Sequence, residues 1–176
     1  MKMLKLVVGP LKTNCYLLYE DGKCLIIDPG DEENNIIKQI EKLKVTPLAI
    51  LLTHNHFDHT GCADSLSSLY KIPILDHKNL FEEKKVIPPF EFYTIYTPGH
   101  SSSSITFYFD DYDIMFVGDF VFCENIGRVD LPSGSFKDMI ASINKLKTYD
   151  DKITLFPGHG DKTSIAHEKK YNNYFK

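Results

Sequence analysis

The pattern of apolar and polar residues divides the chain into short strands and a few amphipathic helices. Runs rich in β-branched, leucine and aromatic residues, bounded by turn residues, predict strands at 4–8, 16–19, 25–27, 48–52, 72–75, 92–96, 105–109, 114–117 and 153–156. Helical patterns follow Asp31 and Ser135 and also cover 58–70, 79–83 and 163–171. Strands and helices therefore alternate in the same way in both halves of the chain.

Two of the predicted helices carry start signals. Asp31 can cap a helix whose apolar face is formed by Ile36, Ile37, Ile40 and Leu43. Ser135, with Asp138 three residues later, resembles a capping box. That helix is expected to bury Phe136, Met139, Ile140, Ile143 and Leu146.

The repeated pattern predicts two β-rich halves, each with its own sheet. Two sheets packed together with helices on the outside would bury both apolar faces. The fold class is therefore α+β. At 176 residues the length suits one domain, so we expect a single domain spanning 1–176.

Composition changes this picture little, but it excludes several functions. The chain has 20 basic and 24 acidic residues, a net charge of −4, which disfavours binding to nucleic acid or to an anionic membrane. No apolar run is long enough for a membrane span or a secretion signal. The four cysteines, Cys15, Cys24, Cys62 and Cys123, form no C-x-x-C pair. We expect a cytoplasmic protein that acts on a small molecule.

The segment Thr53-His54-Asn55-His56-Phe57-Asp58-His59 carries the strongest chemical signal. It directly follows the buried strand 48–52. His54 and His56 are two residues apart, so in extended backbone they point to the same side. Imidazole and carboxylate groups are preferred by zinc and other first-row metals. The segment therefore predicts a metal site where a strand meets a helix.

Three further residues of ligand type also follow the ends of predicted strands. They are His100, Asp119 and His159. Ligands on loops at one edge of a sheet scaffold are how such sites are usually built. His77 and His167 lack this placement, and we interpret both as ordinary surface residues.

The resulting seven donors are too many for one tetrahedral ion and suit two neighbouring ions. One ion would take His54, His56 and His100. The other would take Asp58, His59 and His159. Asp119 would bridge the two ions, and neither coordination sphere would be closed by protein, which is typical of a catalytic site.

Secondary roles are predicted for a few residues near these donors. Asp28, at a strand end, is the candidate carboxylate that orients a metal-bound histidine. Arg128, the sole arginine, is expected to form an ion pair with Asp130 or another carboxylate near the site, with a substrate carboxylate as the alternative. Cys62 is interpreted as a small buried residue. The serines 101–104 are interpreted as a loop.

The order H-x-H-x-D-H, a later His, Gly-Asp and a final Pro-Gly-His-Gly resembles the metallo-β-lactamase superfamily. Short motifs around Thr13, Asp28 and Arg128 resemble its glyoxalase-II-like, or hydroxyacylglutathione hydrolase-like, branch. The resemblance implies a four-layer αββα sandwich, with the metal ions at one edge between the halves. Full glyoxalase II carries a helical C-terminal extension that supplies much of its glutathione contact, so the substrate-binding residues stay unknown.

The function predicted on this basis is thioester hydrolysis by a hydroxide that bridges two divalent ions, with Asp58 and Asp119 orienting the nucleophile. Zinc is the favoured metal, and iron and manganese are the alternatives. A rival is an iron-dependent persulfide dioxygenase that would use His54, His100 and Asp119. A lactonase is a second rival, and a metal-binding scaffold without catalysis is the non-enzymatic alternative.

Overall fold

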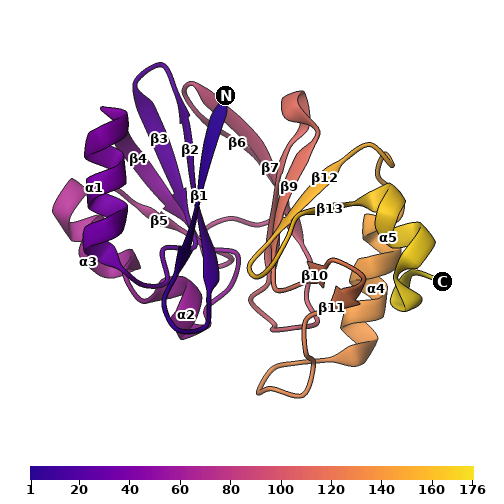
Figure 1. Ribbon diagram of the computed structural model, residues 1–176. Coiled ribbons are helices and arrows are strands. Elements are labelled where there is room, and N and C mark those ends of the chain that lie inside the picture. Colours follow the sequence, from indigo (N-terminus) through magenta and orange to yellow (C-terminus); the bar gives the residue numbers. More distant parts are fainter.

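Residues 2–75 form the first of two sheets, with two helices on its outer face (Figure 1). The computed structural model describes residues 1–176. The strand order is β1–β2–β3–β4–β5. The elements are β1 (Lys2–Val8), β2 (Thr13–Glu20), β3 (Lys23–Ile27), α1 (Glu33–Leu43), β4 (Thr46–Leu51), α2 (Phe57–Thr60), α3 (Ala63–Tyr70) and β5 (Ile74–Leu75).

The second sheet is built from the rest of the chain, in the order β13–β12–β9–β8–β7–β6. Its strands are β6 (Lys84–Ile87), β7 (Phe90–Tyr96), β8 (Ile105–Phe109), β9 (Ile114–Gly118), β12 (Thr154–Pro157) and β13 (Thr163–Ser164). The remaining elements are η1 (Asp110–Tyr112), the hairpin strands β10 (Val121–Phe122) and β11 (Asn125–Ile126), α4 (Phe136–Leu146), α5 (Ile165–Tyr171) and η2 (Asn173–Phe175). None of the helices combines the length and the hydropathy that crossing a membrane requires.

Three apolar clusters hold the layers together. The middle cluster joins the two sheets and is rich in aromatic rings, among them Tyr16, Phe107 and Phe116. A second cluster packs α1 and α3 on the first sheet, and a third packs α4 and α5 on the second. Figure 1 shows the resulting order of helices, sheet, sheet and helices. The predicted α+β, four-layer αββα sandwich is therefore confirmed.

The predicted helix at 58–70 is in fact two helices, α2 and α3, with a break at Gly61 and Cys62. The N–H of Cys62 donates to the carbonyl of Pro29 at 2.9 Å. A Cβ on Gly61 would lie 2.2 Å from the carbonyl oxygen of Gly30. The loop after β3 thus packs directly against the chain at this point, and this tertiary contact replaces the helical hydrogen bonds.

The two predicted helix caps differ in outcome. Ser135 caps α4 as predicted, because its Oγ accepts from the N–H of Asp138 at 3.2 Å. Asp31 is not a helix cap. Glu32, in a left-handed conformation, stands at that position without a side-chain cap bond. Phe136 was expected in the core, but 53% of it is exposed because it lies at the first turn, before the helix reaches the sheet.

The segment 79–83 was predicted to be helical, but it forms no helix. Asp76 and Asn79 close a turn instead: the N–H of Asp76 donates to Oδ1 of Asn79 at 3.0 Å. Strand β6 follows, and it was not predicted. The two-residue strands β10, β11 and β13 were also missed, since such short strands leave no periodic pattern.

Candidate metal centre

Four segments of the chain carry the seven predicted donors to one edge of the sandwich. The β4–α2 connection supplies His54 and His56, and α2 itself supplies Asp58 and His59. The other three, His100, Asp119 and His159, follow β7, β9 and β12. Strands β9 and β12 run parallel, with Gly118 opposite Pro157, and this register brings the loops with Asp119 and His159 side by side.

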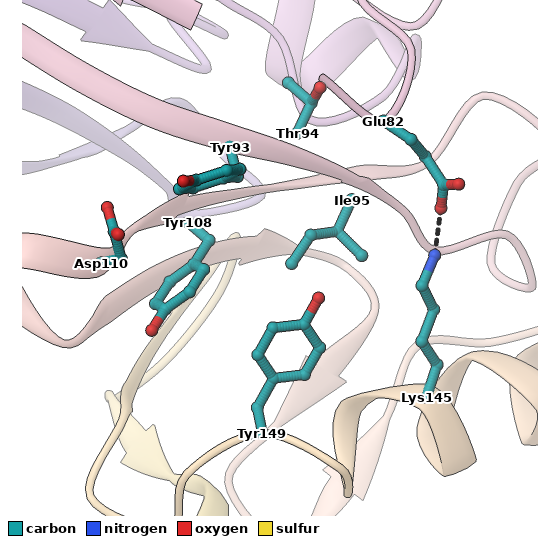
Figure 2. Close-up of a pocket in the computed structure, with 8 residues that line it drawn as sticks. All are labelled: Glu82, Tyr93, Thr94, Ile95, Tyr108, Asp110, Lys145 and Tyr149. Carbon is teal, nitrogen blue, oxygen red and sulfur yellow. Dashed lines mark hydrogen bonds and ion pairs between the residues drawn. The ribbon is translucent and has the colours of Figure 1, made fainter. Parts of the chain in front are cut away.

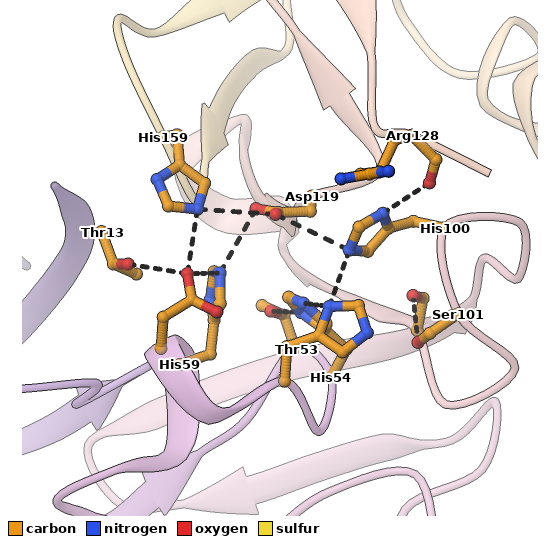
Figure 3. Close-up of polar contacts among 12 residues, drawn as sticks. Thr13, Thr53, His54, His59, His100, Ser101, Asp119, Arg128 and His159 are labelled. Carbon is orange, nitrogen blue, oxygen red and sulfur yellow. Dashed lines mark hydrogen bonds and ion pairs between the residues drawn. The ribbon is translucent and has the colours of Figure 1, made fainter. Parts of the chain in front are cut away.

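Three imidazole nitrogens meet on one side of the cluster (Figure 3). Nδ1 of His56 lies 3.1 Å from Nε2 of His54 and 2.9 Å from Nε2 of His100. A single ring nitrogen cannot satisfy two other ring nitrogens through one proton. The arrangement instead resembles three donors that share one cation.

A second donor set lies next to the first. Nε2 of His159 is 3.2 Å from Oδ2 of Asp58, and Nε2 of His59 is 3.5 Å from the same oxygen. Asp119 stands between the two sets: its Oδ1 is 3.3 Å from Nε2 of His59, and its Oδ2 is 3.7 Å from Nε2 of His100. The structure therefore brings all seven side chains together in the grouping expected from the sequence.

Other side chains hold three of the four donors from the β4–α2 connection and α2. Oδ2 of Asp28 lies 3.0 Å from Nδ1 of His59 and accepts from the hydroxyl of Thr53 at 2.7 Å. Thr53 Oγ1 in turn lies 3.1 Å from Nδ1 of His54. The hydroxyl of Thr13 donates to Asp58 at 3.0 Å. Such contacts fix the orientation of metal-ligating groups.

Backbone carbonyls hold the outer ends of the other two histidines. Nδ1 of His100 lies 2.8 Å from the carbonyl oxygen of Arg128, and Nδ1 of His159 lies 3.1 Å from that of Leu11. The Arg128 guanidinium pairs with Asp130 through two hydrogen bonds of 2.7 and 2.8 Å. Arg128 thus contacts a donor through its main-chain carbonyl, and it also lines the cavity over the donors.

The electrostatics of the cluster suit a cation. Burial lowers the pKa of His54 far below its ordinary value and lowers the pKa of His56 as well, so both rings are neutral at pH 7. Burial opposes ionisation of Asp58, but His159 and His59 outweigh it and lower the pKa to about 2. Neutral imidazoles and ionised carboxylates are the forms that bind metals.

The pKa values of two further histidines, His59 and His159, show how strongly negative the centre is. Burial lowers the pKa of His59, yet the carboxylates of Asp28 and Asp119 outweigh it and raise the pKa to about 10. Hydrogen bonds to Asp119 and Asp58 raise the pKa of His159 to about 10. The carboxylates hold positive charge on these rings, and a bound cation would replace the two protons.

Two buried atoms of the cluster test whether the residues present fit a metal ion. Nε2 of His59 and Oδ1 of Asp119 are buried and lie 3.3 Å from each other, but neither has a hydrogen-bond partner of acceptable geometry. Leaving such groups unpaired is costly, and buried polar atoms in native proteins almost always have a partner. Both atoms point into the cluster (Figure 3). The residues present therefore fit a metal centre.

A cavity of about 770 Å³ opens over the donors. Its lining residues are Leu11, Asn55, His56, Phe57, Asp58, Asp119, Arg128, Leu131, Pro132, Ser133 and His159. A second cavity, of about 500 Å³, lies on the second sheet between Tyr93, Tyr108 and Tyr149, beside the Glu82–Lys145 ion pair (Figure 2). This second cavity has no histidine or cysteine. The chemistry therefore belongs to the first.

The sequence indicated Asp28, which lies 3.0 Å from the ring of His59, but not the other supporting residues. Thr53 and Thr13 gave no signal beyond their place beside His54 and in the Thr13-Asn14-Cys15-Tyr16 motif. The serine loop also contributes, because the hydroxyl of Ser103 donates to Oδ1 of Asn55 at 2.8 Å and so links the loop to the β4–α2 connection. Cys62 is buried, as expected, with 8% of its surface exposed.

Comparison with known proteins gives matches along nearly the whole chain. The model of the metallo-beta-lactamase superfamily matches residues 8–86 and 76–159. The probable metallo-hydrolase YqgX of Bacillus subtilis is 35% identical over 205 aligned positions, covering 99% of this chain and 97% of that protein. Hydroxyacylglutathione hydrolase GloC of Haemophilus influenzae is 32% identical, covering 95% and 94%.

Solved structures agree with this. The B3 metallo-beta-lactamase BLEG-1 is 31% identical and superposes with a TM-score of 0.95, covering 99% of both chains. TTHA1623, crystallised in a di-iron-bound form, is 29% identical with a TM-score of 0.90, covering 97% of this chain and 99% of that one.

Proposed function

The chain belongs to the metallo-β-lactamase superfamily, and from that premise we propose that it is a binuclear metal-dependent hydrolase that cleaves thioesters such as a hydroxyacylglutathione. The observation that carries the proposal is the set of seven converging donors with two buried, unpaired atoms among them. The relative GloC, named a hydroxyacylglutathione hydrolase, supports the substrate class.

His54, His56 and His100 would hold one ion, Asp58, His59 and His159 the other, and Asp119 would contact both. Two divalent ions, with zinc favoured and iron or manganese as alternatives, supply a water-derived nucleophile at neutral pH and a Lewis acid for the carbonyl oxygen. Asp58 and Asp119 orient the attacking water. The cavity above the donors binds the acyl group and the thiol carrier.

The outer contacts keep these groups in position. Asp28 and Thr53 together fix the rings of His59 and His54, so that one buried carboxylate aligns a donor from each set. Thr13 donates a hydrogen bond to Oδ2 of Asp58, the same oxygen that lies 3.2 Å from Nε2 of His159, and so holds that oxygen within the donor set. The donors thus lose their conformational freedom during folding, before a substrate binds.

A persulfide dioxygenase with one iron is the main rival. It would use His54, His100 and Asp119. The complete second set of Asp58, His59 and His159, with all donor atoms within 4.8 Å of one another, would then serve no purpose. The second set therefore favours the two-ion hydrolase.

Metal analysis of protein purified without added zinc, combined with an assay on lactoylglutathione, tests the proposal. We expect two ions per chain and release of free thiol. One iron per chain with oxygen uptake on glutathione persulfide would overturn it in favour of the dioxygenase. Acyl lactones and a β-lactam complete the substrate panel, the latter because BLEG-1 is named a metallo-beta-lactamase; preferential cleavage of either would replace the thioester proposal.

A further inference from the structure

A second group of ligand-type side chains joins the β10–β11 hairpin to helix α5. Cys123, His167 and Glu168 each offer an atom, and these atoms all lie within 4.8 Å of one another. Nε2 of His167 is 3.9 Å from Sγ of Cys123 and 3.0 Å from Oε1 of Glu124. These four residues are separate from the seven donors described above.

One member of the group is already fixed in place. The carboxylate of Glu168 is fully buried. It accepts hydrogen bonds from the N–H of Glu124 at 3.0 Å, from the amide of Asn172 at 2.7 Å and from the hydroxyl of Thr163. These contacts also tie the turn that carries Cys123 to helix α5. The fold itself therefore holds the three donors close together, and their proximity does not depend on mobile surface side chains.

The charges around Cys123 favour a cation. Burial raises the pKa of the Cys123 thiol, and the carboxylates of Glu168 and Glu124 raise it further. A shallow cavity of about 310 Å³ opens beside the group, and one ammonium, Lys162, lines it. The two carboxylates outnumber that ammonium, so the local field attracts a divalent ion.

We propose that Cys123, His167 and Glu168 form a separate surface site for one zinc-like ion, with Glu124 available as a fourth ligand. Thiolate, imidazole and carboxylate are all zinc ligands, and the mixed set excludes magnesium and calcium, which require oxygen donors. When the ion binds, the sulfur–metal bond forms and the thiol proton leaves to solvent.

The site would stiffen the support of two donors in the main centre. Strand β10 begins two residues after Asp119. The next residue of that strand, Phe122, lies with its ring centroid 6.2 Å from that of His159. An ion that clips the hairpin to α5 would therefore limit movement behind both donors. The histidine that we interpreted as an ordinary surface residue, His167, would gain a specific role.

Cobalt titration of the full-length, chelator-treated protein tests the site, because cobalt bound to a thiolate has a characteristic charge-transfer absorption. The main centre contains only nitrogen and oxygen donors, so that absorption reports a cysteine, and Cys123 is the one exposed cysteine. We expect it to develop with a stoichiometry of one ion per chain, and metal analysis with zinc to give three ions in total. Cys123→Ser and His167→Gln should each abolish the absorption.

Two controls separate this proposal from the proposed hydrolase function. Cys62→Ser should retain the absorption, since Cys62 is buried in the apolar cluster between the first sheet and its helices. His56→Ala should also retain it while losing thioester hydrolysis. The proposal is overturned if no thiolate absorption develops after three equivalents of cobalt, or if the absorption survives in Cys123→Ser.

Discussion

The two halves of the molecule supply donors to the centre in different ways. The first half contributes His54, His56, Asp58 and His59 from one short segment, the β4–α2 connection and α2, and other side chains hold three of these four donors. The second half contributes three donors from three separate loops, and backbone carbonyls hold its two histidines. A side-chain support can be lost by a single substitution, whereas a carbonyl support belongs to the fold. The halves should therefore differ in their sensitivity to mutation.

We expect the largest effect of any substitution at Asp119, because its carboxylate faces donors of both halves. Asp119→Ala should abolish turnover of lactoylglutathione and reduce the bound metal. His56→Ala should abolish turnover as well. Steady-state kinetics and metal analysis measure both effects.

A remote carboxylate provides the control for Asp119→Ala. Asp151, which is exposed and paired with Lys169, should tolerate alanine without loss of turnover. Full activity in Asp119→Ala would refute the two-ion centre.

Removing the ions would show how much they contribute to the free energy of unfolding by joining donors from the two halves. One ion that binds only the folded chain, present at 100 times its Kd, stabilises it by about 2.7 kcal/mol. For a domain of this size each kcal/mol moves Tm by about 2–4 °C, so loss of even one such ion to a chelator should lower Tm by about 5–10 °C, and loss of two by about twice that. Thermal unfolding with and without chelator measures this. An unchanged Tm would mean that the ions do not join the halves.

Asp28→Asn tests the side-chain support of the first half. The amide keeps the size of the carboxylate but loses the charge that orients His59, and we expect metal affinity to fall about 10–100-fold. Competition with a chromophoric chelator measures the affinity. Asp31→Asn, an exposed position in the same loop, is the matched control. Equal effects of the two substitutions would remove the distinction between the supports.

Arg128→Lys should have the smallest effect. The guanidinium and its partner Asp130 are exposed, and such pairs contribute little. The carbonyl that contacts His100 is unchanged by the substitution, so metal affinity and Tm should stay at their original values. A loss of metal would show that the ion pair positions this carbonyl, and the comparison between the halves would then need revision.

The larger elements were predictable because each satisfies a local rule. Helix α4 has its Ser135 cap and a buried face that includes Met139 and Ile143. The central strands are continuous apolar runs. The errors occur where a contact distant in sequence decides the local structure. Gly61 and Cys62 break a helix because the loop after β3 packs against them.

The candidate centre shows the same division. The H-x-H-x-D-H segment could be recognised as a metal-binding motif because its donors are neighbours in sequence. The placement of His100, Asp119 and His159 after strands indicated the other three donors. The supports from Thr53 and Thr13, and the carbonyls of Arg128 and Leu11, gave no such signal. A hydroxyl or a carbonyl acquires its role only from the partner that folding brings to it.

The sequence by itself determined which residues could bind metal and that two sheets would carry them, because donor chemistry and hydrophobic periodicity are properties of residues and their spacing. Only the tertiary structure decided which nitrogen faces which oxygen. It also decided that two buried atoms remain unpaired, and that Cys123 meets His167 and Glu168. These relations join residues that are up to 148 positions apart, and no local pattern in the sequence determines a distance across a folded core.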